Sequence, residues 1–308
     1  MVVIRGFLTC ATGCRALVKG AAVLLVAAWG LSSCGEPPQA KPTPLTEDQL
    51  RARTEVVYAS VDMYKPVAGE QTQLDVYQAP MFYREHPAEQ ESIDQDLEFA
   101  RLKLTDGELA LDITQPAVYT HEGKVLHGAI DHEQITFLWF RRAGGQGPIL
   151  AQGLRLTYDS AGFPAIFEVL EDQSGKSLFY ASATLEALAL ERHGPVLQGR
   201  TYALEPSRAE APEALVVRTV KQGAQALGPL VYDGFAGADI LQLHCRCAPS
   251  QLKAIGNSVE YELIPFGSLD ATLIEALTRE LKWGDAGKDL GFPASVWPLA
   301  SLRLPDSF

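Results

Sequence analysis

The chain has 308 residues, of which 47% are apolar and 21% charged, a composition typical of a folded globular protein. Its 26 Lys and Arg residues against 38 Asp and Glu residues give a formal net charge of −12. Because an acidic surface repels phosphate groups, the composition argues against nucleic acid as a partner and offers no basic face for a membrane.

The N-terminal segment has the charge and hydropathy of a secretory signal. Residues 1–20 carry only positive charge, and residues 21–31 (AAVLLVAAWGL) form an uninterrupted apolar run. A helix of that length reaches about 16 Å, too short for a hydrocarbon core of ~30 Å. The run has the length of a signal-peptide apolar region, so we predict that residues 1–33 are a signal peptide.

The apolar run ends in Leu31, Ser32, Ser33 and Cys34, which resemble the lipobox of bacterial lipoproteins, the substrates of type II signal peptidase. In that family the cysteine thiol receives diacylglycerol, the peptide is cut before it, and the new amino terminus is usually acylated. The resemblance implies lipidation of Cys34 and the lipid bilayer as partner through that acylated residue. Gly35 implies an outer-membrane protein facing the periplasm, because inner-membrane retention in enteric bacteria typically follows Asp there. The alternative is an ordinary secretory signal with an incidental cysteine.

Residues 35–44 (GEPPQAKPTP) contain four prolines and cannot pack a core. At ~3.1 Å per residue, such an extended segment spans about 30 Å. We therefore expect residues 34–45 to be the lipidated cysteine with a Pro-rich tether, and residues 46–308 to be the folded domain.

The first element after the tether is predicted to be a helix. Thr46 and Gln49 form a capping box, with Leu45 and Leu50 placed as the hydrophobic staple. Apolar residues at helical spacing continue through Val57, Val61 and Tyr64. This pattern predicts a helix from residue 46 until Lys65-Pro66.

From about residue 72 the apolar period becomes that of strands. Residues 98–113 alternate on either side of Asp106-Gly107, a strong hairpin signal, and residues 117–127 repeat the pattern around Glu122-Gly123. Further strands are expected at 135–140, 149–158, 164–170, 177–181, 214–222, 238–246 and 258–264.

Two later helices are predicted, at 183–192 and at 268–284. The second has Ser268 as a plausible cap and an apolar stripe at Leu269, Leu273, Leu277 and Leu281. Strands in meander order with segregated helices predict an α+β fold with a mainly antiparallel sheet and three to four helices. The Pro/Ala/Glu-rich stretch 205–214 is a possible internal subdivision.

Three histidines, His121, His127 and His132, occur within twelve residues and raise the question of a metal site. A hairpin turning at Glu122-Gly123 pairs His121 with Lys124 and so separates His121 from His127 along the ladder. This arrangement favours surface histidines, and we predict neither a metal ion nor another cofactor.

The stretch LHCRC contains His244, Cys245 and Cys247, the last two being the only thiols of the predicted mature domain. In a regular strand Leu241, Leu243, Cys245 and Cys247 share one face, while His244 lies on the other. This alternation favours two buried thiols. A strained disulfide at a bend before Pro249 and a metal or redox site with His244 remain the alternatives.

The sequence contains none of the common nucleotide-binding, metalloprotease or α/β-hydrolase motifs. Two hypotheses of different class follow. The first is a non-catalytic binding, scaffolding or envelope-assembly module that contacts another envelope protein or a glycan. The second is a tethered periplasmic enzyme, a hydrolase or thiol-redox protein, whose catalytic residues leave no local motif.

Overall fold

The computed structural model describes residues 45–53, 61–67, 73–85, 99–142, 147–170, 175–234, 240–245, 258–281 and 301–308. All of them belong to one unit of the chain, Pro42–Phe308. The predicted signal peptide and the tether up to residue 44 lie outside the described residues.

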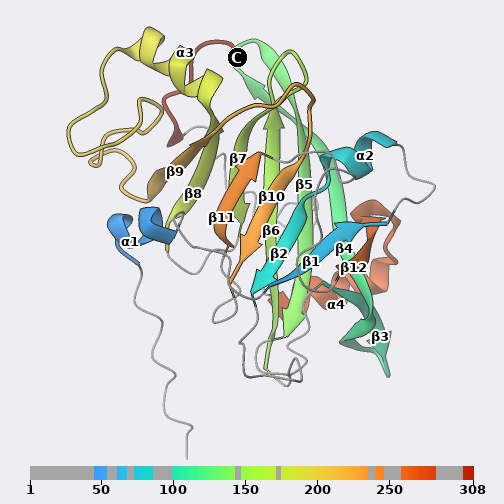
Figure 1. Cartoon of the computed structure of the whole chain (residues 1–308). Coiled ribbons are helices and arrows are strands. Elements are labelled where there is room, and N and C mark those ends of the chain that lie inside the picture. Colours follow the sequence, from blue (N-terminus) through green and yellow to red (C-terminus); the bar gives the residue numbers. More distant parts are fainter. Residues whose placement is uncertain are drawn as a thin grey trace, which may run out of the picture. The chain divides into compact units, whose positions relative to one another are not determined.

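Twelve strands of the described residues form one mixed sheet with the strand order β11-β10-β2-β1-β12-β4-β5-β6-β7-β8-β9, and β3 pairs with β4 (Figure 1). The strands are β1 Val61–Pro66, β2 Met81–Glu85, β3 Ala100–Thr105, β4 Glu108–His127, β5 Ile130–Arg142, β6 Ile149–Tyr158, β7 Pro164–Leu170, β8 Ser177–Ser182, β9 Ala214–Val220, β10 Pro229–Asp233, β11 Ile240–Cys245 and β12 Ser258–Pro265. The helices are α1 Glu47–Ala52, α2 Gln73–Gln78, α3 Ala183–His193 and α4 Ala271–Leu281, with a short 3-10 turn, η3, at Phe266–Ser268.

The α+β class is confirmed, because an antiparallel meander from β4 to β8 makes up most of one half of the sheet. Four pairs are parallel: β1 with β12, β2 with β10, β4 with β12 and β8 with β9. The predicted bounds of β6 and β7 are confirmed, and β5, β8, β9, β11 and β12 overlap the predicted ranges.

The Asp106-Gly107 turn is confirmed, but the predicted turn at Glu122-Gly123 is wrong. Asp106 and Gly107 have φ of 54° and 83°, which these residue types tolerate, and they join β3 to β4. The second turn instead lies at Gly128, with φ of 61°, so β4 runs straight through Glu122-Gly123. Gly123 therefore pairs with Gln134 of β5 as an ordinary strand residue.

The predicted helix from residue 46 to Lys65-Pro66 is also wrong in its second half. The capping box of Thr46 and Gln49 is present, but α1 ends at Ala52. Residues 61–66 are β1, held between β2 and β12. Here pairing with distant strands overrides the local helical spacing, a tertiary effect that the sequence pattern does not contain.

The sheet curls so that its two halves face each other across an inner core. Phe82, Val231 and Leu243 come from one half, and they belong to the same buried cluster as Trp139, Leu154 and Tyr180 from the other. The strands at the two ends of the order, β9 and β11, are in contact. Figure 1 accordingly shows β1, β2, β10 and β11 in front of the central strands.

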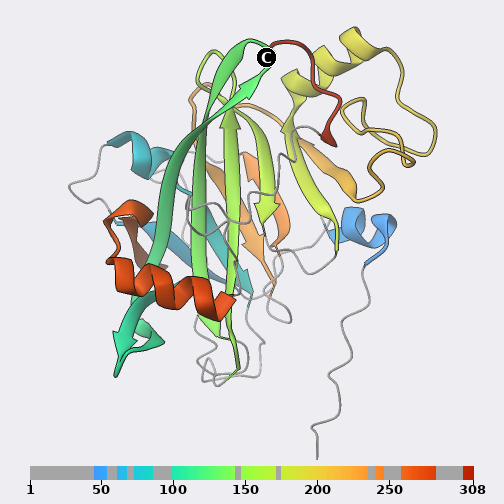
Figure 2. The ribbon, with the colours of Figure 1, turned by 180° about the vertical axis from the view of Figure 1, so that it is seen from behind.

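The outer face of the β4–β9 half carries two separate apolar clusters. This face is toward the viewer in Figure 2. The α4 cluster contains Leu138, Phe140, Leu273 and Leu277, which confirms that the Leu stripe of α4 is a packed element. The α3 cluster contains Phe179, Leu185, Leu304 and Phe308, so α3 and residues 301–308 cover the other end.

The start of α4 corrects one detail, because Asp270 rather than Ser268 occupies the capping place. An Asp270 carboxylate oxygen accepts a hydrogen bond of 2.8 Å from the backbone N–H of Thr272. Ser268 belongs to η3 and donates to the carbonyl of Pro265 at 2.6 Å.

Candidate functional site

The predicted cysteine-containing site is only partly within the described residues. Cys34 and Cys247 lie outside them, and the backbone of Cys245 pairs with Pro229 at the end of β11. His244 is half-buried; burial and, secondarily, Arg218 lower its pKa. The described part of the chain contains no group of three or more His, Cys, Asp or Glu residues that could hold a metal ion. Whether the two thiols are buried, bridged or reactive therefore stays a prediction.

The strict alternation expected along β11 is broken by a β-bulge opposite Tyr232 and Asp233. Because of this shift Ile240 and Leu243, three residues apart, both lie in the inner core. Gln242, the residue between Leu241 and Leu243, is buried as well.

The three neighbouring histidines are not a group of surface residues, so that prediction is wrong for His132. Its side chain is buried and stacks on the Phe308 ring with centroids 4.1 Å apart. His127 and His193 donate from Nε2 to the carbonyls of Pro305 (2.8 Å) and Leu304 (3.0 Å). These contacts give His127, His132 and His193 a structural task, which is to hold residues 304–308.

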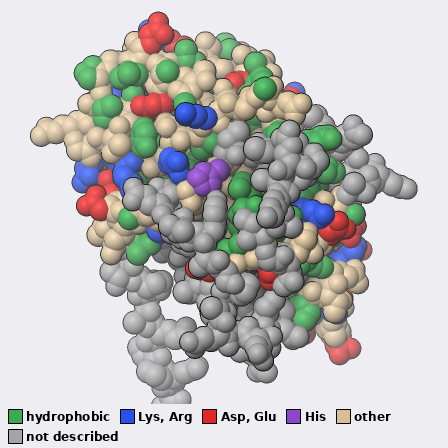
Figure 3. Space-filling model, viewed as in Figure 1, with side chains coloured by type: hydrophobic (Ala, Val, Ile, Leu, Met, Phe, Trp, Pro, Cys, Tyr) green, Lys and Arg blue, Asp and Glu red, His purple; other side chains and the backbone are tan. Residues whose placement is uncertain are grey.

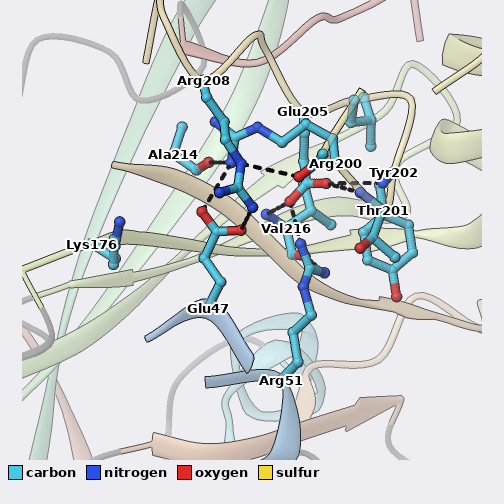
Figure 4. Close-up of polar contacts among 12 residues, drawn as sticks. Glu47, Arg51, Lys176, Arg200, Thr201, Tyr202, Glu205, Arg208, Ala214 and Val216 are labelled. Atoms are coloured by element: carbon cyan, nitrogen blue, oxygen red, sulfur yellow. Dashed lines mark hydrogen bonds and ion pairs between the residues drawn. The ribbon is translucent and has the colours of Figure 1, made fainter. Parts of the chain in front are cut away.

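A cluster of ion pairs, here called the clasp, joins α1 to the segment before β9 and consists of Glu47, Arg51, Arg200, Glu205 and Arg208 (Figure 4). The fully buried Glu205 carboxylate accepts a 2.6 Å hydrogen bond from Arg51. Its other donors are three backbone N–H groups, those of Thr201 (2.7 Å), Tyr202 (2.9 Å) and Val216 (3.2 Å). Both carboxylate oxygens are therefore saturated.

Arg200, the buried cation of the clasp, is satisfied in the same way. Its guanidinium donates to the backbone carbonyls of Pro206 (2.9 Å), Ala211 (2.8 Å) and Ala214 (3.1 Å). Glu47 of α1 lies 3.6 Å from Arg200 and 2.9 Å from Arg208. The stretch 205–214, where composition suggested a subdivision, is thus tied to both α1 and β9.

A second polar cluster lies on the outer face of the sheet, where strand pairing places its members side by side. We call it the polar band: His121, Gln134, Thr136, Arg155, Thr157 and Glu168. One cross-strand row contains His121, Thr136, Arg155 and Glu168, from β4, β5, β6 and β7 in turn. The next row contains Gly123, Gln134 and Thr157. The band separates the α3 cluster from the α4 cluster.

In contrast to the clasp, the polar band has few internal partners. An oxygen of Glu168 lies 3.5 Å from Arg155, and the Gln134 amide donates to the Thr157 hydroxyl at 2.9 Å. The described part of the chain offers these six side chains no other hydrogen bond or ion pair. Burial raises the pKa of Glu168 to about 7, although the positive charge of Arg155 acts in the opposite direction. The pKa of His121 is lowered, mainly by burial and to a smaller extent by the charge of Arg155.

Of the polar band, only His121 was singled out from the sequence. The available signal was a charged residue between apolar neighbours, Arg155 in the LRL of β6 and Glu168 in the AIFEVL of β7. Such charges need an explanation, because buried charged groups are rare without saturated partners.

In comparisons with known proteins, no family model, no curated protein and no solved structure matches the chain. Within the described residues, none of the helices combines the length and the apolar character needed to cross a bilayer. On the face seen in Figure 3, Lys and Arg side chains are interspersed with Asp and Glu side chains.

Proposed function

We propose that the protein is a lipid-anchored bacterial envelope protein whose domain, residues 46–308, is a non-catalytic binding or scaffolding module. The anchor is the acylated Cys34, and the Pro-rich tether leads from it to the domain. Gly35 favours the outer membrane, with the domain in the periplasm.

The observation that carries this proposal is the order of elements at the start of the domain. The lipobox-like sequence, the tether and a capped helix follow one another within residues 31–52. That helix is fixed to the sheet by the clasp residues Glu47 and Arg51 and by the buried Leu50. Terminal segments are usually poorly ordered unless they are held to the domain. A first helix fixed in this way gives the tether a stable point of attachment.

The test is the chemistry and the location of the mature N-terminus. Mass spectrometry of membrane-extracted protein should find Cys34 as the first residue, carrying diacylglycerol. Cys34→Ser should release the domain from membranes or leave an uncleaved precursor. An unmodified Cys34, or cleavage at another site, would rule the proposal out.

A second candidate function, a tethered enzyme, is favoured by Glu168. A carboxyl group with a pKa of about 7 next to an arginine can exchange protons near neutral pH, as a general acid or base does. This candidate predicts hydrolysis of some member of a panel of chromogenic esters and glycosides, lost on Glu168→Gln. Turnover that survives Glu168→Gln would place catalysis elsewhere, for example at the thiols Cys245 and Cys247.

A further inference from the structure

We propose that the polar band is a ligand site for a neutral, hydroxyl-rich molecule, a saccharide. This inference deepens the binding-module proposal by naming the ligand class, and it can hold whether or not Cys34 is lipidated.

The first step of the argument is the hydrogen-bonding deficit. Glu168, with its side chain only 9% exposed, has Arg155 at 3.5 Å as its one partner in the described part of the chain. A buried carboxylate normally has several close donors, as Glu205 does. The remaining polar atoms of the band have no further partner among the described residues, so they can bond water or a ligand.

The second step is the type of atom that is left over. His121, Thr136 and the carbonyl end of Gln134 make no hydrogen bond within the described residues. Together with the guanidinium of Arg155 and the Glu168 carboxyl group, they present donors and acceptors side by side. A hydroxyl group both donates and accepts, so a ligand with several hydroxyls satisfies such a mixture.

The third step is charge. Arg155 and Glu168 are direct cross-strand neighbours, so an anion at the band would meet a carboxylate and a cation would meet a guanidinium. A neutral ligand meets neither penalty. Side chains on adjacent strands are about 5 Å apart, comparable with the width of a hexose ring.

The fourth step is access. His121 and Gln134 are half-buried and the Arg155 side chain is 15% exposed, so this edge of the band reaches the surface, whereas Thr136, Thr157 and Glu168 are buried. At Gly123, an added Cβ atom would meet His121 Nε2 at 4.0 Å and nothing closer among the described residues. There is therefore room for at least a methyl group beside His121, in the row that contains Gln134.

The experiment measures binding of two trisaccharides, tri-N-acetylchitotriose and maltotriose, to detergent-solubilised full-length protein by calorimetry and saturation-transfer NMR. At least one should bind saturably. Glu168→Gln and Thr136→Val should each weaken binding about tenfold, the loss of one good hydrogen bond. Glu133→Gln is the matched control, because Glu133 lies on β5 one residue from Gln134, is exposed and pairs with Lys124.

Thermal midpoints of all variants separate loss of binding from loss of fold. Thr136→Val keeps the side-chain shape, so it tests the site even if Glu168→Gln alters stability. The inference is overturned if neither trisaccharide binds saturably at about 10 mM, a very weak affinity on any scale. It is also overturned if binding is unchanged in both band variants, or if inorganic phosphate binds in an Arg155-dependent manner while the saccharides do not. Lipidation of Cys34, measured on the same preparation, reports on the anchor independently.

Discussion

Two glutamates of this protein are buried beside an arginine, yet they differ in the number of hydrogen-bond donors around them. Glu205 receives four close donors, three from the backbone and one from Arg51 at 2.6 Å. Glu168 has one arginine nitrogen at 3.5 Å. Burial raises the pKa of Glu168 to about 7.

The difference distinguishes a structural ion pair, whose hydrogen bonds are all made within the protein, from a carboxyl group that can still accept further hydrogen bonds. A saturated buried pair fixes a helix to a sheet, because every polar atom has its partner before any ligand arrives. An undersaturated one costs stability unless something else contributes hydrogen bonds. Four predictions test this comparison, from the largest expected effect to the smallest.

Replacing the cation of the clasp should have the largest effect. Arg51→Met leaves the fully buried Glu205 without its cation, which should lower the free energy of unfolding by about 3–5 kcal/mol. Urea denaturation measures this loss. Arg155→Met at pH 6 is the matched variant and should cost far less, because Glu168 can take up a proton. Equal losses in the two variants would contradict the distinction.

The cost of removing an apolar core contact provides a reference for the stability losses of the ion-pair variants. Leu277 is fully buried between α4 and the sheet, so Leu277→Ala should cost roughly 2–5 kcal/mol. Leu190 on the outer surface of α3 is the control, and its replacement by Ala should change stability by less than about 0.5 kcal/mol. A loss below that value at Leu277 would mean that α4 is not packed in solution.

The pH dependence of stability should report on Glu168. Its pKa in the folded protein lies above its usual value, so its contribution is fully favourable below about pH 4.5 and is lost as the pH rises through about 7. Glu168→Gln removes this loss, which amounts to at most about 3 kcal/mol at pH 8. Denaturation of both proteins from pH 4.5 to 8 gives the difference.

Titration of His121 changes the pH dependence of stability in the opposite direction to Glu168. The contribution of Glu168 is therefore measured as the difference between the original protein and Glu168→Gln. The pKa of His121 is lowered in the folded protein, so the contribution of His121 is present above the usual histidine value and is lost as the pH falls. Both proteins carry this effect, and subtraction removes it. A difference curve that does not change with pH would show that Glu168 titrates normally.

The exposed ion pair between Lys124 and Glu133 should have the smallest effect. Both side chains are more than half exposed, with the charges 2.7 Å apart. Replacing Glu133 by Gln should change stability by less than about 1 kcal/mol, and less at high salt. A larger change would remove its value as the control for the polar band.

Local signals in the sequence predicted local structure well. The capping box at Thr46, the Asp106-Gly107 turn and the stripe through Leu273 and Leu277 each depend on residues a few positions apart, and each is confirmed. Strands β6 and β7 were equally readable, because turn residues flank an apolar run on both sides.

Features made by distant residues could not be predicted in the same way. Val61–Pro66 became a strand because β12, almost 200 positions later in the chain, pairs with it. The polar band forms only when four strands are aligned in register, so residue spacing in the sequence does not predict it. The missing partners of Glu168 are visible only when its neighbours are known.

The position of β12 also has a consequence for the order of events during synthesis. This strand lies between β1 and β4, and among the described strands it makes the hydrogen-bonded connection between β11, β10, β2 and β1 on one side and β4 to β9 on the other. The meander can form from consecutive segments as they emerge, but the complete sheet must wait for residues 258–265. A chain that crosses a membrane N-terminus first would therefore expose the unpaired edges of β1 and β4 until translocation is nearly finished. Over that interval such a chain would depend on chaperones, or on rapid completion of the sheet, to avoid aggregation.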